Sequence, residues 1–186
     1  MSALDLTGKR SSQLPTLLIA LGFLVVAAVF ISTTDWFTFF LTVHVTFVVI
    51  WIGGGMMLTI LGVLAERKSD GEELVAIARQ AAFVGERIFA PSGIVVVAMG
   101  VAMIENGGLG YNHFWVVFGL LGFLSTFLTG VGVLAPMSKK VAAVVEAHGP
   151  NAPESKAAVS KILLIARADV ALLLLVVVDM VTRPFY

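Results

Sequence analysis

The fold follows from one stretch, residues 37–65, which reads FTFFLTVHVTFVVIWIGGGMMLTILGVLA. These 29 positions hold no Asp, Glu, Lys or Arg. A helix that crosses the hydrocarbon core of a bilayer needs about 20 apolar residues. As a helix, this stretch would be ~43 Å long at ~1.5 Å per residue, longer than a core of ~30 Å. It therefore predicts a transmembrane helix that either tilts or protrudes from the bilayer.

Four further apolar stretches lie at positions 14–31, 88–104, 114–135 and 162–181. The chain of 186 residues is 59% hydrophobic and only 13% charged, with a mean hydropathy of +1.00. A soluble domain has roughly 45–50% apolar and about 25% charged residues. So small a protein cannot bury this much apolar surface, so lipid must cover it. We predict an all-α, polytopic membrane helix bundle with about five transmembrane helices in one domain over 1–186.

The first stretch has a second interpretation, because Lys9 and Arg10 precede it and Ala27 and Ala28 resemble a signal-peptide cleavage site. The apolar run continues past these alanines, which favours a retained helix.

Lysine and arginine predict the orientation. If the N-terminus is cytoplasmic, all but one of the 12 basic residues lie on or near the inner side, and only Arg183 lies outside. Short cytoplasmic segments carry such an excess. We expect a multi-pass membrane protein with a cytoplasmic N-terminus and an external C-terminus.

Two connections on the inner side have helical patterns of their own. Asp70 and Glu73 have the spacing of a capping box. An apolar stripe at helical spacing follows, formed by Leu74, Ile77, Ala78, Ala81 and Ala82. This pattern predicts a short amphipathic helix along the inner interface, and 141–147 predicts a shorter one. Pro91 is expected to kink the third transmembrane helix.

Several functional classes are excluded. The net charge is zero and no basic cluster is suited to a phosphate backbone, which argues against nucleic acid. The absence of cysteine excludes disulfides, thiolate metal sites and cysteine nucleophiles. The three glycines at 53–55 lie inside a helix without a preceding strand, so they do not form a phosphate loop.

His44 is the first candidate for chemistry. Positions 7, 11 and 18 residues later return to nearly the same helix face, so His44, Trp51, Gly55 and Gly62 form one stripe. One interpretation is a packing groove in which the imidazole makes one hydrogen bond. The alternative is a flat ligand such as haem, or a copper ion, bound through His44 and contacted by Trp51 and Gly55.

His113 is the candidate second ligand. LTILGVLA at 58–65 and LTGVGVLA at 128–135 share six of eight residues at an offset of 70. If this match is a true repeat, His44 and His113 lie at similar depth, as in a b-type haem or copper site. Apolar low-complexity sequence also produces such matches by chance, which would leave His113 as a loop residue.

Charged residues near the inner ends form a third group: Glu86, Arg87, Arg167 and Asp169. Charges inside a bilayer usually pair with each other, so we expect buried bridges such as Arg167–Glu86 or Asp169–Arg87. The alternative is a polar pathway. Asp179, near the outer end, is expected to reach water.

The pattern His44-x6-Trp51-Ile-Gly-Gly resembles a family of uncharacterised bacterial integral membrane proteins, a domain of unknown function. ERIFAP at 86–91 and DMVTRP at 179–184 fit the same resemblance. The wider relatives of that family look like the membrane domain of copper-resistance protein D and the haem-binding membrane protoporphyrinogen oxidase. The resemblance implies a helical bundle in a bacterial inner (plasma) membrane and, by analogy, a haem or copper role.

Three hypotheses follow. The first is a redox or electron-transfer protein that binds b-type haem or copper through His44. The second is a small transporter that uses the charges of the last helix. The third is an accessory subunit of a larger membrane complex, or a homo-oligomer.

Overall fold

The structure is a computed structural model that describes the backbone of residues 3–184 and the side chains of residues 15 and 17–184. Its described part is helical and contains no strand. The elements are α1 (Ala3–Thr33), α2 (Trp36–Lys68), α3 (Gly71–Val84), η1 (Gly85–Phe89), α4 (Ala90–Gly107), α5 (Phe114–Thr129), η2 (Gly130–Leu134), α6 (Ala135–His148) and α7 (Pro153–Thr182). The chain divides into two compact units, Met1–Phe39 and Phe40–Tyr186. The all-α prediction is confirmed.

The first unit consists mainly of α1, which contains Pro15. Its apolar part is Leu17–Thr33, and every side chain described in that part is exposed.

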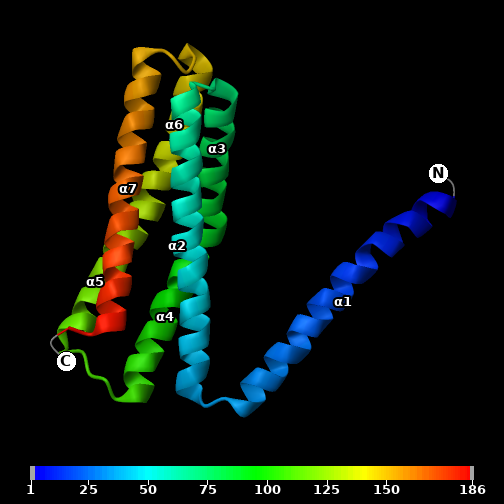
Figure 1. Ribbon diagram of the computed structural model, residues 1–186, viewed down its shortest axis with the longest axis vertical. Coiled ribbons are helices and arrows are strands. Elements are labelled where there is room, and N and C mark those ends of the chain that lie inside the picture. Colours follow the sequence, from blue (N-terminus) through cyan, green and yellow to red (C-terminus); the bar gives the residue numbers. More distant parts are fainter. Residues whose placement is uncertain (1–2, 185–186) are drawn as a thin grey trace. The chain divides into compact units, whose positions relative to one another are not determined.

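The second unit is a bundle of α2 to α7, in which successive long helices run in opposite directions (Figure 1). The turns at 69–70 and 149–152 meet at one end, which we call the basic end. The connection 108–113 and Arg183 lie at the other, which we call the Trp115 end.

Two short π-helices, η1 and η2, join α3 to α4 and α5 to α6. In each, the alanine before a proline donates its backbone N–H five residues back, from Ala90 to Gly85 and from Ala135 to Gly130. A proline inside a helix cannot donate and clashes with the carbonyl four residues earlier. The wider π turn accommodates Pro91 and Pro136. The two π-helices also lie side by side, and a Cβ at Gly85 would lie 3.1 Å from the Cβ of Ala135, the first residue of α6.

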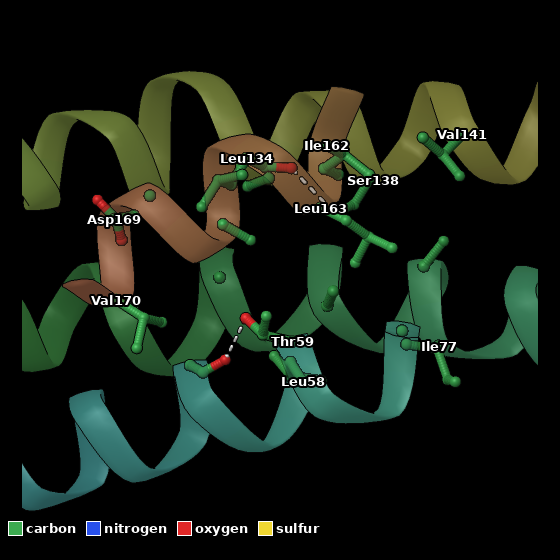
Figure 2. Close-up of a pocket in the computed structure, with 18 of the residues that line it drawn as sticks. Leu58, Thr59, Ile77, Leu134, Ser138, Val141, Ile162, Leu163, Asp169 and Val170 are labelled. Carbon is green, nitrogen blue, oxygen red and sulfur yellow. Dashed lines mark hydrogen bonds between the residues drawn. The ribbon is translucent and has the colours of Figure 1, made fainter. Parts of the chain in front are cut away.

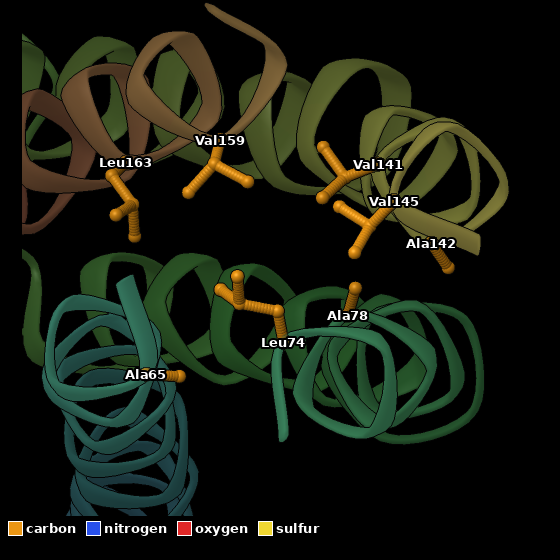
Figure 3. Packing of buried hydrophobic residues seen from close by; sticks show 8 residues of the cluster. All are labelled: Ala65, Leu74, Ala78, Val141, Ala142, Val145, Val159 and Leu163. Carbon is orange, nitrogen blue, oxygen red and sulfur yellow. The ribbon is translucent and has the colours of Figure 1, made fainter. Parts of the chain in front are cut away.

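The two amphipathic helices are present, as α3 and α6. Asp70 caps α3 by accepting from the backbone N–H of Glu73 at 3.0 Å, whereas the Glu73 carboxylate pairs with Lys68. The apolar stripe of α3 does not face a membrane surface. It packs against α6 in a core at the basic end (Figure 3), whose members are Ala65, Leu74, Ala78, Val141, Ala142, Val145, Val159 and Leu163. In the chain, α3 is followed through η1 by the apolar α4, and α6 is preceded through η2 by the apolar α5.

A second core lies nearer the middle of the bundle, around Trp51. The indole stacks on Phe89, with ring centroids 5.3 Å apart, and also contacts Phe123 and Phe127. These rings approach closely because Gly93 has no side chain: a Cβ there would lie 2.4 Å from Phe127 and 2.5 Å from Trp51. Aromatic packing of this kind joins α2, η1, α4 and α5.

Three described helical segments are long and apolar enough to cross a membrane: Trp36–Lys68, Gly71–Gly107 and Phe114–His148. The apolar part of α1 is shorter. In α7, three charged residues, Arg167, Asp169 and Asp179, interrupt the apolar run. Large apolar side chains remain exposed on the bundle, for example Val49, Ile94, Leu121 and Val178. Lipid contact accounts for these exposed surfaces.

Candidate ligand cavity and histidine site

His44 lies between α2 and α4. Its Nδ1 is 2.8 Å from the carbonyl oxygen of Val96, and its ring faces Gly100, where a Cβ would lie 3.3 Å from the imidazole Cε1. A carbonyl oxygen only accepts, so Nδ1 is the donor, and in the neutral imidazole Nε2 carries a lone pair. Histidines that bind metals are commonly oriented in this way, by a hydrogen bond from the other ring nitrogen to a backbone carbonyl.

The stripe predicted from His44 faces the inside of the bundle, although its members meet different helices. Trp51 is only 3% exposed and lies in the aromatic core. Gly55 and Gly62 face α7, at Val170 and Leu163 respectively. The stripe is therefore chiefly a packing surface, against α4 at His44, against η1 and α5 at Trp51, and against α7 at the two glycines.

His113 precedes α5 in extended conformation and stacks on Trp115, with ring centroids 6.5 Å apart. Trp115 belongs to a cluster with Ile104 of α4. Ile104 is eight residues beyond Val96, the partner of His44, which corresponds to ~12 Å of helix at ~1.5 Å per residue. The two histidines thus have separate neighbours.

The similar depth of His44 and His113 was inferred from two matching octapeptides. These octapeptides differ in conformation. Residues 58–65 are regular α-helix, whereas 128–135 contain η2. Within the described residues, no group of three or more His, Asp or Glu side chains is placed to hold a metal ion. His113 as a second ligand stays a prediction.

The predicted buried bridges need correction. Glu86 pairs with Lys139 of α6, and neither Arg167 nor Asp169 takes part in the ion pairs of the described residues. Glu86, Arg87 and Arg167 are exposed. The reason is that Glu86 and Arg87 fall in the π turn, which presents them at the bundle surface next to α6. Only Asp169 is partly buried.

Asp169 lines a cavity of about 120 Å³ in the interior of the bundle (Figure 2). Almost all of its wall is apolar or glycine, and α2, α3, α6, α7 and both π-helices contribute residues. The other polar side chains in the wall, Thr59 and Ser138, donate to carbonyls of their own helices, those of Gly55 and Leu134. The wall also includes Trp51, Gly55 and Gly62 from the predicted stripe.

Asp169 marks one end of this cavity, and Ile77 and Val141 lie toward the other. No hydrogen bond or ion pair joins its carboxylate to another of the described side chains. An ionised carboxylate in apolar surroundings is costly unless it gains a counterion or a proton. The arrangement therefore offers one anionic group to a ligand whose remainder is apolar.

Sequence reasoning missed a second feature of α7. Asp179 was expected to reach water but is only 6% exposed, and neither of its carboxylate oxygens has a hydrogen-bond partner. Trp115 has an equally buried, unpartnered Nε1. The two π-helices were also missed, although the recurrence of Gly-x4-Ala-Pro at 85–91 and 130–136 signals them.

An all-α bundle with three helices fit to span a bilayer, apolar outer surfaces and an interior cavity defines a polytopic integral membrane protein. The chain belongs to the family described as predicted integral membrane protein (DUF2269), whose model matches residues 38–184. The match begins close to the start of the second compact unit, so the family corresponds to the bundle without α1. No curated protein and no solved structure matches the chain.

Proposed function

We propose that the protein is a small membrane transporter or carrier whose interior cavity binds a lipophilic organic cation, with Asp169 as the counterion. The observation that carries this proposal is the Asp169 carboxylate, which has no partner in an otherwise apolar cavity. Ionisable residues within membrane helices are rare and usually functional.

The cavity dimensions limit the ligand. An apolar cavity of ~150 Å³ in another protein binds benzene, so about 120 Å³ suits one small ring or a short alkyl group. A hydrated metal ion is less suitable, because the remaining wall offers few oxygen ligands. A benzylammonium-like molecule satisfies both the apolar wall and the carboxylate.

The orientation of the protein belongs to this proposal. We place the basic end in the cytoplasm and the Trp115 end outside, because exposed lysine and arginine gather at the basic end. In a bacterial inner membrane the cavity then lies toward the cytoplasmic side.

The test compares benzylammonium with benzyl alcohol, which is neutral and nearly identical in shape. Calorimetry on the full chain in lipid nanodiscs should show tighter binding of benzylammonium. In Asp169→Asn this preference should disappear, and Glu154→Gln, an exposed carboxylate near the start of α7, serves as the control. Uptake of labelled benzylamine into proteoliposomes should depend on Asp169. Equal discrimination by Asp169→Asn and the wild type would refute the proposal.

A second candidate function is haem b or copper binding through His44, the redox hypothesis. The bond from Nδ1 to Val96 supports it, because the bond orients the ring and leaves Nε2 available. Absorption spectra of the purified protein, oxidised and reduced, together with a copper assay, test this candidate. A Soret band or bound copper that is lost in His44→Ala, but kept in His148→Ala, would support it. A wild-type protein with neither would leave His44 as a packing residue.

A further inference from the structure

The Trp115 end holds two buried polar groups whose hydrogen-bonding needs are complementary. Asp179 is 6% exposed and Trp115 is 5% exposed, and neither the carboxylate nor the indole Nε1 has a partner in the described part of the chain. Buried polar groups are paired in the great majority of cases. Because the indole Nε1 is itself a donor, the unpaired Asp179 carboxylate is the group that a bound cation could satisfy.

The register of α5 against α7 places these groups near each other. Glycines of α5 receive side chains of α7: Val176 meets Gly122, and Met180 meets Gly119. One turn further along, the Arg183 guanidinium lies over the ring of Trp115. Asp179 is therefore level with Gly119, one helical turn from Trp115. Asp179 and Arg183 are four residues apart and share a face of α7.

Arg183 shows what this site can bind. Its guanidinium carbon is 5.1 Å from the centroid of the Trp115 ring, a cation–π distance. It does not pair with Asp179, although a bridge between positions four residues apart is sterically accessible. Glu105, another carboxylate near this end, is exposed and accepts a hydrogen bond from the Tyr111 hydroxyl at 2.6 Å. Asp179 is thus left as an unpaired carboxyl group one helical turn from a ring that already holds a cation.

We propose that Trp115 and Asp179 form a second cation site, for a guanidinium or small organic ammonium group, in which Arg183 acts as a tethered occupant. A free cation would displace Arg183 from the ring, stack on the indole and pair with Asp179. A guanidinium suits the site best, since its planar fork binds a carboxylate and its face stacks on an aromatic ring. This site is separate from the Asp169 cavity and does not depend on the function proposed there.

The test uses methylguanidinium as the probe and calorimetry on the full chain in nanodiscs. Removal of the tethered cation in Arg183→Gln should tighten binding roughly tenfold, the change that ~1.4 kcal/mol of lost competition would give. Adding Asp179→Asn to Arg183→Gln should abolish this binding. Trp115→Leu in the Arg183→Gln background should weaken it, which provides a second variant if Asp179→Asn does not fold.

Glu154→Gln in the Arg183→Gln background removes an exposed carboxylate at the opposite end of α7; it is the matched control and should leave the binding unchanged. Binding that is lost in Asp169→Asn but kept in Asp179→Asn would instead assign the probe to the Asp169 cavity and overturn the proposal. Unchanged affinity in Arg183→Gln, or binding that persists without both Asp179 and Trp115, would also overturn it.

Discussion

The two ends of the bundle differ in where their charged side chains lie and in whether these are paired. At the basic end the ion pairs lie on the surface, where Lys68 meets Glu73, Arg79 meets Glu146 and Lys139 meets Glu86, around a hydrophobic core. Further along α7, Asp169 lines a cavity and Asp179 is buried, and neither carboxylate has an ion-pair partner among the described residues.

These two arrangements of charge have different effects on the stability of the fold. Exposed pairs cost little to form and contribute little. A buried carboxylate without a partner, by contrast, destabilises the fold unless a ligand or proton compensates. Both proposed binding sites therefore lie on α7, whereas α3 and α6 pack together in the core at the basic end.

The largest expected effect tests whether aromatic packing holds the middle of the bundle. Trp51→Ala should destabilise the protein by about 3–5 kcal/mol, because it leaves a cavity among Phe89, Phe123 and Phe127. Denaturant unfolding in detergent measures the change. Trp36→Ala, whose ring is 70% exposed, should cost less than about 1 kcal/mol. Similar losses in both variants would contradict the assignment of Trp51 to a core.

The next effect concerns the close approach of helices in the same region. Gly93→Ala should cost about 1–3 kcal/mol, since its methyl group would overlap the rings of Trp51 and Phe127. Gly53→Ala is the control, because a Cβ at Gly53 meets nothing within 4 Å. That variant should instead gain up to about 1 kcal/mol from helix propensity. A Gly93→Ala protein as stable as Gly53→Ala would argue against this packing.

A substitution at Asp179 tests whether its unpartnered carboxylate lowers stability, because removal of the carboxylate should then stabilise the fold. Asp179→Leu replaces an unpartnered buried carboxylate with an apolar side chain, and we expect a gain of about 1–2 kcal/mol. Thermal unfolding without added ligand measures it. A large loss of stability would mean that the carboxylate already has a partner that holds the fold together.

The smallest effect is expected at the basic end. Lys139→Gln removes the surface pair with Glu86 and should change the unfolding free energy by less than about 1 kcal/mol. Lys140→Gln, the neighbouring exposed lysine without an ion pair in the described structure, is the control. A loss of several kcal/mol specific to Lys139 would remove the contrast between the two ends.

Much of the fold could be predicted from local pattern. The apolar stretch 37–65 lies within α2, Leu74, Ala78 and Ala82 of the α3 stripe are buried, and Asp70 caps that helix. These features follow from composition and from the 3.6-residue helical period, which are properties of one segment at a time. The partner of the α3 stripe could not be predicted in this way, because a membrane surface and another helix present the same apolar face.

The candidate site was predicted less well. The inward orientation of His44 and Trp51 could be read from a single helix, but the pairing of Arg167 or Asp169 with Glu86 or Arg87 could not. That error arose because pairing was inferred from similar depth in the bilayer, whereas the π turn presents Glu86 to Lys139.

The sequence alone determined that this protein is a helical membrane bundle, since about twenty consecutive apolar residues have few other stable environments. Which of its carboxylates have no ion-pair partner depends on the tertiary structure. That property depends on the register between helices far apart in the chain, such as α5 and α7, where Gly119 and Gly122 admit Met180 and Val176 and bring Asp179 toward Trp115. A contact of this kind is fixed by how two surfaces fit together through space, and no local pattern encodes it.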